Sequence, residues 1–226
     1  MTSLFSPMEL QQALGLPSAG LTPVIDETSG LRLWLLDIDA DKVEMNAAEI
    51  GAFWQQLPFW AFAWAAGRAL AGYIGQHPEC VRGKRVLDFG CGSGIAGLAA
   101  AKAGAEQVYL CDLDPVALQA AECNAALNHL TVNCLDAGAD IPAVDIVLAA
   151  DVLYDISSSS DLQACFDAVP EWLLAERRQI VDHRQLPQTA ALNSLAQMAT
   201  ATLPAIGDFD AHVLVDIYHH AVKASE

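Results

Sequence analysis

The sequence predicts an α/β fold: a doubly wound, mostly parallel sheet of seven strands, of the Rossmann-like kind. Short apolar runs alternate along the chain with segments whose apolar residues recur at helical spacing, which is the pattern of βα units. Residues 144–150 are apolar at nearly every position, as expected of a strand buried on both faces of a parallel sheet. Another apolar run, at 86–89, leads into closely spaced glycines, which is typical of nucleoside-binding α/β folds.

Strands are expected where apolar runs are bounded by turn residues, and helices where apolar residues recur every three or four positions. The expected strands are residues 31–37, 86–89, 107–111, 131–135, 144–150 and 178–181, with one or two more in 209–223. The expected helices are residues 65–76, 95–102 and 115–127, one that begins near 160, and one around 192–199. Asp114 and Pro115 predict the N-cap and first turn of the third of these helices.

Length and charge limit the domain organisation and the class of partner. A chain of 226 residues is long enough for one α/β core, so we expect a single domain. Residues 1–57 are expected to form an N-terminal extension with a strand and an acidic loop, and residues 58–226 the main part of the domain. The net charge of −17 would repel a phosphate backbone, so we expect no nucleic-acid partner; a basic or lysine-bearing protein fits better.

Cysteine usage and hydropathy predict a soluble, cytoplasmic protein. The six cysteines form no C-x-x-C pair and several fall on apolar faces, so we expect buried, reduced thiols and no metal site. No apolar run approaches the length of a transmembrane helix, so we expect no membrane association.

The turn after residues 86–89 has the composition of a cofactor-binding loop. Gly90, Gly92 and Gly94 stand at alternate positions, and glycine tolerates both positive φ and the close approach of a ligand to the backbone. Asp112 closes the next expected strand, about 20 residues on, where nucleoside-binding folds place the acid that hydrogen-bonds a ribose. A simple turn would also use glycines, but here strand, glycines, helix, strand and acid occur in the order of a binding site.

Two cofactors are compatible with this loop. Gly92, Gly94 and Gly97 also spell the G-x-G-x-x-G of dinucleotide binders, which would make the chain an NAD(P)-dependent oxidoreductase. A pyrophosphate would then meet the carboxylate of Asp88 in a strongly acidic chain. S-adenosylmethionine carries a sulfonium and an ammonium, which carboxylates attract, so the charges favour this cofactor. A non-catalytic cofactor-binding protein is a third alternative.

Several motifs resemble those of a known enzyme class. The segments VLDFGCGSGIAGLAAAKAGA, CDLDP and NAALN resemble the first motifs of class I S-adenosylmethionine-dependent methyltransferases. The segments PFWAFAWAAGRALAGYI and DIVLAADVLYD resemble the aromatic lead-in and the Asp-x-x-Tyr motif of the seven-strand protein-lysine methyltransferases called family 16. Within that group, the chain looks most similar to the branch that acts on the electron transfer flavoprotein beta subunit. The likeness covers residues 58–155 and is faint outside them.

The resemblance implies a class I methyltransferase fold and methylation of lysine side chains. It implies a protein substrate, such as the electron transfer flavoprotein beta subunit or a ribosomal protein, and it places Trp64 beside the cofactor. A small-molecule amine is the alternative acceptor, because no residue identifies the acceptor. Methyltransferases that act on nucleobase amines usually carry Asn or Asp, two prolines and an aromatic where this chain has DVLY, which further disfavours nucleic acid.

Acidic residues follow the expected strands at the edge where open α/β sheets bind their ligands. They are Asp88, Asp112, Asp136, Asp151 and Asp182. Asp88 and Asp112 are predicted to bind the cofactor, together with the loop glycines, and Asp136 to lie near the adenine.

Asp151 and Tyr154 are the predicted catalytic residues. Asp151 follows the strand expected to flank the first central strand across the topological switch point. We therefore expect its carboxylate to orient the ammonium of the incoming lysine and Tyr154 to wall the channel. His183 is the alternative base, although a lone histidine after a strand is more often structural.

Overall fold

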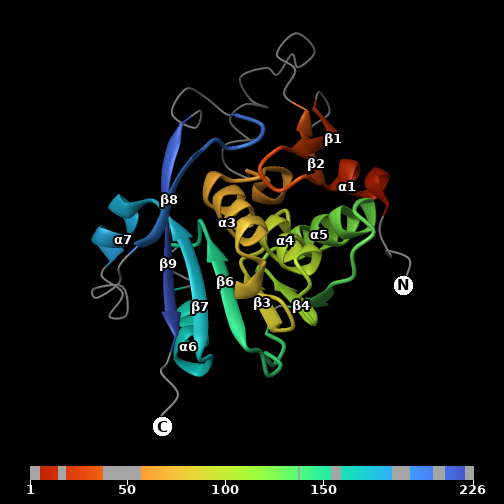
Figure 1. The fold of residues 1–226 in the computed structure, drawn as a ribbon. Helices are drawn as coiled ribbons and strands as arrows, with labels where there is room; N and C mark the ends of the chain where they lie inside the picture. Colours follow the sequence, from red (N-terminus) through yellow and green to blue (C-terminus); the bar gives the residue numbers. More distant parts are fainter. Residues whose placement is uncertain are drawn as a thin grey trace.

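A seven-stranded sheet forms the centre of the computed structural model, which describes residues 6–14, 19–37, 57–136, 138–153, 159–184, 194–205 and 212–221. The strand order is β5-β4-β3-β6-β7-β9-β8 (Figure 1). The strands are β3 (Arg85–Phe89), β4 (Gln107–Cys111), β5 (Asn133–Leu135), β6 (Ile146–Ala150), β7 (Glu171–Glu176), β8 (Ser194–Thr200) and β9 (Val213–Ala221). Strands β3 to β7 are parallel, whereas β9 is antiparallel to β7 and β8. The predicted doubly wound, mostly parallel sheet is confirmed.

The order of the strands fixes where a ligand can bind. The chain builds outward from β3 through β4 to β5, then returns to place β6 on the other side of β3. The connections on the two sides of this point leave in opposite directions, which opens a crevice at the carboxyl ends of β3 and β6.

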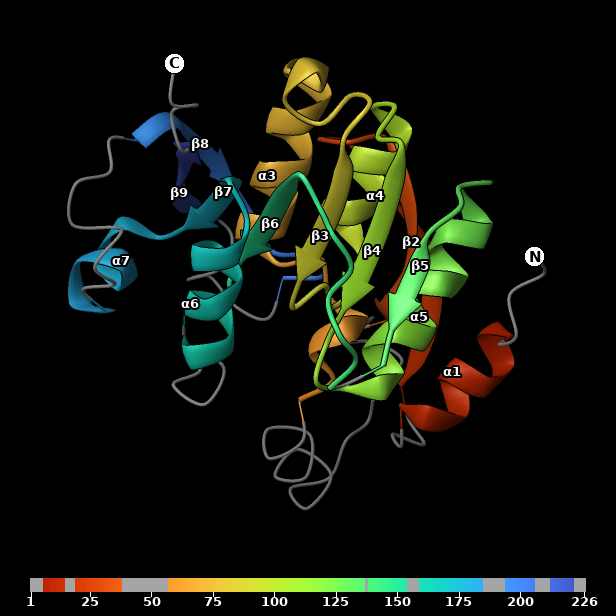
Figure 2. The ribbon, with the colours of Figure 1, turned by 90° about the horizontal axis from the view of Figure 1, so that it is seen from below.

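Helices cover both faces of the sheet (Figures 1 and 2). On one face lie α3 (Ala65–Gln76), α4 (Ile95–Lys102) and α5 (Pro115–Leu127), and on the other lies α6 (Ser159–Ala168). Helix α7 (Arg178–Arg184) contacts β9, and α1 (Pro7–Ala13) contacts α5. Two short 3-10 helices, η1 (Phe59–Ala61) and η2 (Pro78–Cys80), flank α3.

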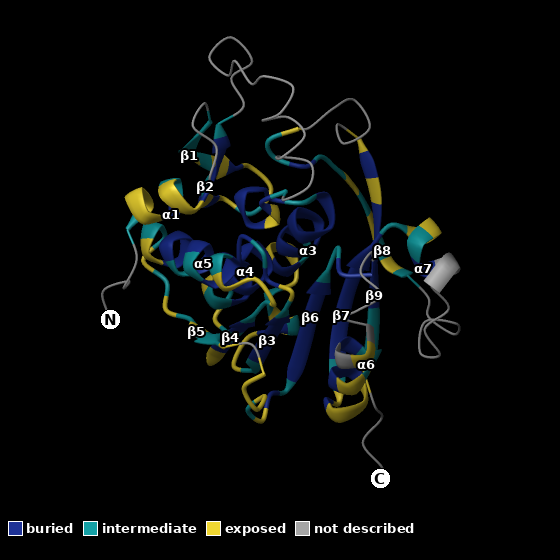
Figure 3. Ribbon diagram, turned by 180° about the vertical axis from the view of Figure 1, so that it is seen from behind, coloured by how far each residue is buried: buried dark blue, intermediate teal, exposed yellow. Residues whose placement is uncertain are grey.

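The side chains of the central strands alternate between two cores. Ile146 and Leu148 of β6 pack with α3 and α4, whereas Val147 and Ala149 pack with α6. Figure 3 shows β6 and β7 buried along most of their length. Because both faces are covered, these strands read in the sequence as continuous apolar runs.

A hairpin from the N-terminal extension belongs to the larger core. Its strands are β1 (Gly20–Asp26) and β2 (Leu31–Asp37), and Leu33 and Leu35 of β2 are buried against α3, α4 and α5. The side-chain oxygens of Asn124 on α5 and of its C-cap residue Asn128 accept hydrogen bonds from backbone amides of β2 at 2.7 and 2.9 Å. The strand predicted at 31–37 is confirmed, whereas β1 and α1 were not predicted. The expected acidic loop after it lies outside the described residues.

The last parallel strand differs from the sequence prediction. Residues 178–181, expected as a strand, belong to helix α7, and the strand is β7 at Glu171–Glu176. The run Trp172–Ala175 is fully buried, and its side chains alternate between the two cores, as the side chains of a central strand do. Asp182 therefore lies within a helix and not at the end of a strand, which corrects its predicted place on the rim.

The segment predicted as a helix around 192–199 also differs. Residues 194–200 form β8, a strand at the edge of the sheet. Its alanines favour a helix locally, but the segment pairs with β9 from Ser194 opposite Tyr218 to Thr200 opposite Val213. Pairing with a neighbouring strand overrides the local preference, because strand formation depends on the sheet that receives it.

The described residues contain no helix long and apolar enough to cross a membrane. All six cysteines are free thiols. In the same described ranges, no group of three or more His, Cys, Asp or Glu side chains is placed to hold a metal ion.

A buried ion pair fastens the hairpin to α3, and its loss is a test of the packing. Arg68 Nε donates to Asp26 Oδ1 at 2.6 Å, and the side chains are 10% and 0% exposed. We expect Arg68→Met to lower the free energy of unfolding by about 3–5 kcal/mol, because it leaves the Asp26 carboxylate buried without its cation.

Urea denaturation measures this loss. The control is Arg85→Met, which breaks an ion pair with Asp145 whose side chains are 39% and 40% exposed. We expect that change to cost much less, because a solvent-exposed ion pair contributes little to stability. Equal losses in the two variants would contradict the packing described for the hairpin.

Candidate active site

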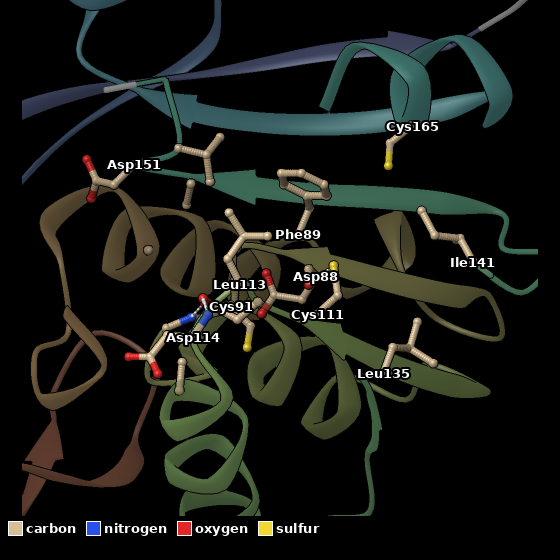
Figure 4. Close-up of a pocket in the computed structure, with 18 of the residues that line it drawn as sticks. Asp88, Phe89, Cys91, Cys111, Leu113, Asp114, Leu135, Ile141, Asp151 and Cys165 are labelled. Atoms are coloured by element: carbon tan, nitrogen blue, oxygen red, sulfur yellow. Dashed lines mark hydrogen bonds between the residues drawn. The ribbon is translucent and has the colours of Figure 1, made fainter. Parts of the chain in front are cut away.

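A cavity of about 1160 Å³ opens at the carboxyl ends of the parallel strands. Its walls are the turn after β3, the start of α3, the loop at 138–144 and one side of α6. Figure 4 shows Asp88 and Cys111 near its middle, Asp151 beyond the end of β6, and Cys165 extending from α6 towards the sheet. Most of the residues predicted from the sequence line it: Trp64, Asp88, Gly90, Gly92, Asp112, Asp136 and Asp151. The fold thus gathers in one cavity residues that are up to 87 positions apart in the chain.

The glycine turn is held by the end of β4. The amides of Gly90 and Cys91 both donate to the carbonyl of Cys111, at 2.9 and 3.0 Å. Gly90 and Gly92 have φ values of 66° and 51°, which an L side chain adopts only with strain. A Cβ at Gly92 would meet nothing within 4 Å, so the turn leaves open space on that side.

Asp112 connects the turn to the next helix. Its Oδ2 accepts from the amide of Gly92 at 2.9 Å, and its Oδ1 accepts from the amide of Asp114 at 3.0 Å. Burial raises the pKa of Asp112, while these amides oppose the shift. Asp114 is the N-cap of α5, as predicted, and accepts from Val116 at 2.8 Å.

Asp88 is an almost completely buried acid of the site, at 2% exposure. Its Oδ2 accepts a hydrogen bond of 2.7 Å from the amide of Gly97 in α4. Burial raises the pKa of Asp88 to about 7, with a smaller contribution from the charge of Asp112 and an opposing one from Gly97. This group is therefore poised to ionise when a cation reaches it.

Gly94 does not belong to the lining of the cavity. It is the N-cap of α4 with φ at 80°, and a Cβ there would come within 2.8 Å of Ala121 Cβ on α5. Close contact between two helices accounts for this glycine. Its predicted contact with the cofactor stays a prediction.

Trp64 forms an aromatic wall at the start of α3. Its indole Nε1 donates to the carbonyl of Phe59 at 2.9 Å, and its ring lies 5.5 Å from that of Phe59 and 5.3 Å from that of Phe62. These contacts fix the indole in the wall of the cavity.

Asp151 adopts an unusual backbone conformation, with φ at 51°. Its Oδ2 accepts a hydrogen bond of 2.8 Å from the amide of Ala66, in the first turn of α3. The positive end of the helix therefore stabilises the carboxylate. Tyr154, the other predicted catalytic residue, lies outside the described residues, and so does the side chain of His183.

The sequence analysis missed an acid in the cavity wall, Glu176. It is the last residue of β7, is 1% exposed and lines the cavity close to Asp151. The signal was present in the sequence, because an apolar run at 172–175 ends in an acid as the other central strands do. It was overlooked because the strand was placed at 178–181.

Comparison with known proteins connects this geometry to a class of enzyme. Residues 77–159 match the family model of ribosomal protein L11 methyltransferase (PrmA). The chain is 37% identical over 120 residues to the electron transfer flavoprotein beta subunit lysine methyltransferase of Danio rerio, covering 51% of this chain and 44% of the relative. It is 34% identical over 159 residues to the protein of that name from Rattus norvegicus, covering 65% and 60%. The chain thus spans about half the length of these relatives.

The fold is also that of solved methyltransferases. The crystal structure of ribosomal protein L11 methylase from Lactobacillus delbrueckii subsp. bulgaricus superimposes with a TM-score of 0.50 at 22% identity, covering 70% of this chain and 79% of the other. The described core therefore has the class I methyltransferase fold, and the resemblance found in the sequence is confirmed.

The conformation of Gly94 gives a test that separates packing from ligand binding. We expect Gly94→Ala to lower the free energy of unfolding by about 1–3 kcal/mol, because alanine is strained at positive φ and its Cβ would press on Ala121. The control is Gly75→Ala in α3, where an added Cβ meets nothing within 4 Å. That change should be neutral or stabilising, by up to about 1 kcal/mol. Thermal denaturation of both variants without ligand makes the comparison, and a stable Gly94→Ala protein would refute the strain.

The raised pKa of Asp88 predicts how stability depends on pH. The folded protein holds the proton of Asp88 more tightly than the unfolded chain, where the pKa is about 3.9. The contribution of Asp88 to the free energy of unfolding therefore falls as pH rises from about 4 to about 7. We expect Asp88→Asn to gain stability relative to the wild type by up to about 3–4 kcal/mol as pH rises over that range.

Urea denaturation of the ligand-free proteins at several pH values gives the two curves. Asp145→Asn is the matched control, because Arg85 lowers the pKa of Asp145 to about 2. Its stabilising contribution is present above the unfolded pKa and is lost as pH falls below about 4, which is the opposite sense. Parallel curves for wild type and Asp88→Asn would show that Asp88 ionises normally.

Proposed function

We propose that this chain, whose core has the class I methyltransferase fold, is an S-adenosylmethionine-dependent protein-lysine N-methyltransferase. One observation carries the proposal: a single cavity joins the glycine turn, Asp88 and Asp112 to Asp151. A cofactor and an acceptor amine can therefore meet in one space at the carboxyl edge of the sheet. The similarity to lysine methyltransferases supports the type of reaction.

The residues of the cavity fit a nucleoside that carries positive charge. Asp88 and Asp112 are carboxyl groups whose pKa is raised by burial, so a cationic ligand would favour their ionised forms. The pyrophosphate of a dinucleotide would instead be repelled by the same two groups. We assign Asp112 to the ribose, Asp136 to the adenine, and Trp64 to the wall beside the cofactor. When bound, S-adenosylmethionine supplies an electrophilic methyl group on its sulfonium.

The acceptor end of the cavity must deliver a neutral amine. Only about one lysine in a few thousand is neutral at pH 7 when its pKa is near 10.4. Burial against the apolar wall around Phe59 and Trp64 would lower that pKa, and the carboxylate of Asp151 would raise it. We assign Asp151 to orienting the ammonium, because its own carboxylate is fixed by the start of α3.

The charge of the chain guides the choice of protein substrate. A net charge of −17 would attract a basic segment around the acceptor lysine. The relatives are named for the electron transfer flavoprotein beta subunit, and the family model for ribosomal protein L11. We propose these two proteins as the first candidate substrates.

Binding and transfer test the proposal separately. We expect calorimetry to show a complex with S-adenosylmethionine and none with NADH, because only the former is a cation. With methyl-labelled cofactor we expect label on lysine of one candidate substrate or of a lysate protein, located by mass spectrometry. Label on a small amine alone would change the assigned acceptor. Stabilisation by NADH without binding of S-adenosylmethionine would overturn the proposed reaction, as would binding without transfer to any acceptor.

A further inference from the structure

Glu176 is a buried carboxylate for which the binding of the cofactor provides no role. It ends β7 and lines the cavity at 1% exposure. Its Oε1 accepts from the amide of Arg177 at 3.0 Å, and its Oε2 accepts from the amide of Leu153 at 3.3 Å. A carboxylate oxygen has two acceptor positions, so each oxygen can accept one more hydrogen bond.

Glu176 and Asp151 stand next to each other at the ends of neighbouring strands. Ala150 and Ala175 are register partners, and the amide of Asp151 donates to the carbonyl of Ala175 at 3.3 Å. Residues 151–153 therefore contact both acids. Asp151 is the first of these residues, and the amide of Leu153 donates a hydrogen bond to the carboxylate of Glu176. Burial, followed by the charge of Asp151, raises the pKa of Glu176 to about 7.

Among the described residues, the surrounding charges leave the carboxyl of Glu176 without a strong ion pair. Arg177 and the two amides oppose the shift of its pKa. On the other side, Asp216 of β9 is the register partner of Glu176, but it is bound by Arg178 at 2.8 Å and by Ser194 and Gln197 at 3.1 Å.

We propose that Glu176 is the group that removes the proton from the acceptor ammonium, while Asp151 orients it. In this step the N–H bond of the ammonium breaks, the proton forms an O–H bond with a carboxylate oxygen of Glu176, and the electron pair stays on nitrogen. The total charge is unchanged: a cation and an anion become a neutral amine and a neutral acid. The inference rests on the proposed function and adds to it the identity of the base.

The two neighbouring acids suit this division of work. A carboxylate with an ordinary pKa near 4 is a poor acceptor for a lysine proton, and a base that ionises near the working pH is a better one. Asp151 is stabilised as an anion by the amide of Ala66, whereas Glu176 lies deeper and close to that negative charge. Asp151 can thus keep its negative charge and attract the ammonium, while Glu176 receives the proton.

Glu176→Gln tests the inference, because it keeps the shape of the side chain but cannot take the proton. We expect methyl transfer to fall by about 10²–10⁴-fold, the usual contribution of a general base. S-adenosylmethionine affinity, measured by calorimetry, should stay within about threefold, because Glu176 is assigned to the acceptor and not to the binding of the cofactor. Glu176→Asp should recover part of the lost rate. The control is Glu171→Gln, at the other end of β7, which should keep the rate of transfer.

The pH profile gives the readout that a structural role would not change. At saturating S-adenosylmethionine, where Asp88 is already ionised by the bound cation, we expect kcat/KM for the acceptor to rise with pH through about 7 as Glu176 loses its proton. This rise should be absent in Glu176→Gln. Asp151→Asn removes a like charge, so the rise should move to lower pH. Carbon-13 NMR of glutamate-labelled protein should show one carboxyl that titrates near pH 7 in the wild type and is missing in Glu176→Gln.

The outcomes separate this inference from the proposed function. If the wild type methylates no acceptor, the proposed function fails and the inference fails with it. If the wild type methylates lysine and Glu176→Gln does so with the same rate and pH profile, only the role of Glu176 is refuted. An ordinary titration of Glu176 near pH 4.3 would likewise refute it.

Discussion

The hydrogen bonds between the turn after β3 and the end of β4 are the constraint on which the site depends. The carbonyl of Cys111 and the carboxylate of Asp112 together hold the amides of Gly90, Cys91 and Gly92. The same turn leads directly into α4, whose Gly97 binds Asp88. The turn that lines the cavity follows β3, and the residues that hold it follow or end β4. The position of the cavity therefore depends on the pairing of these two parallel strands.

Burial of negative charge is the second feature of the site. Asp88, Asp112 and Glu176 all have a raised pKa, and in each case the largest cause is the loss of water. Such groups destabilise the ligand-free protein at neutral pH, and they attract positive ligands for the same reason. The sulfonium nucleoside and the lysine ammonium of the proposed reaction are both cations, so one arrangement of acids can serve both.

Much of the fold, and several of the residues that line the cavity, could be predicted from local patterns. The strand at 107–111, the helices at 65–76 and 115–127 and the cap at Asp114 were all predicted with their bounds. Here periodicity, glycine and capping residues agree with the final packing. Prediction failed in the C-terminal third, where β8 depends on pairing with β9, and where an acid at the end of β7 was hidden by a misplaced strand.

The sequence by itself determined the order of strands and helices from β3 to α6 and the glycine turn, because these depend on residues near one another in the chain. Only the tertiary structure decided that Asp151 accepts from the start of α3, that Gly94 serves contact with α5, and that Glu176 lies beside Asp151. These relations join segments up to 85 residues apart. They arise from strand register and from helix packing, which local residue patterns do not specify.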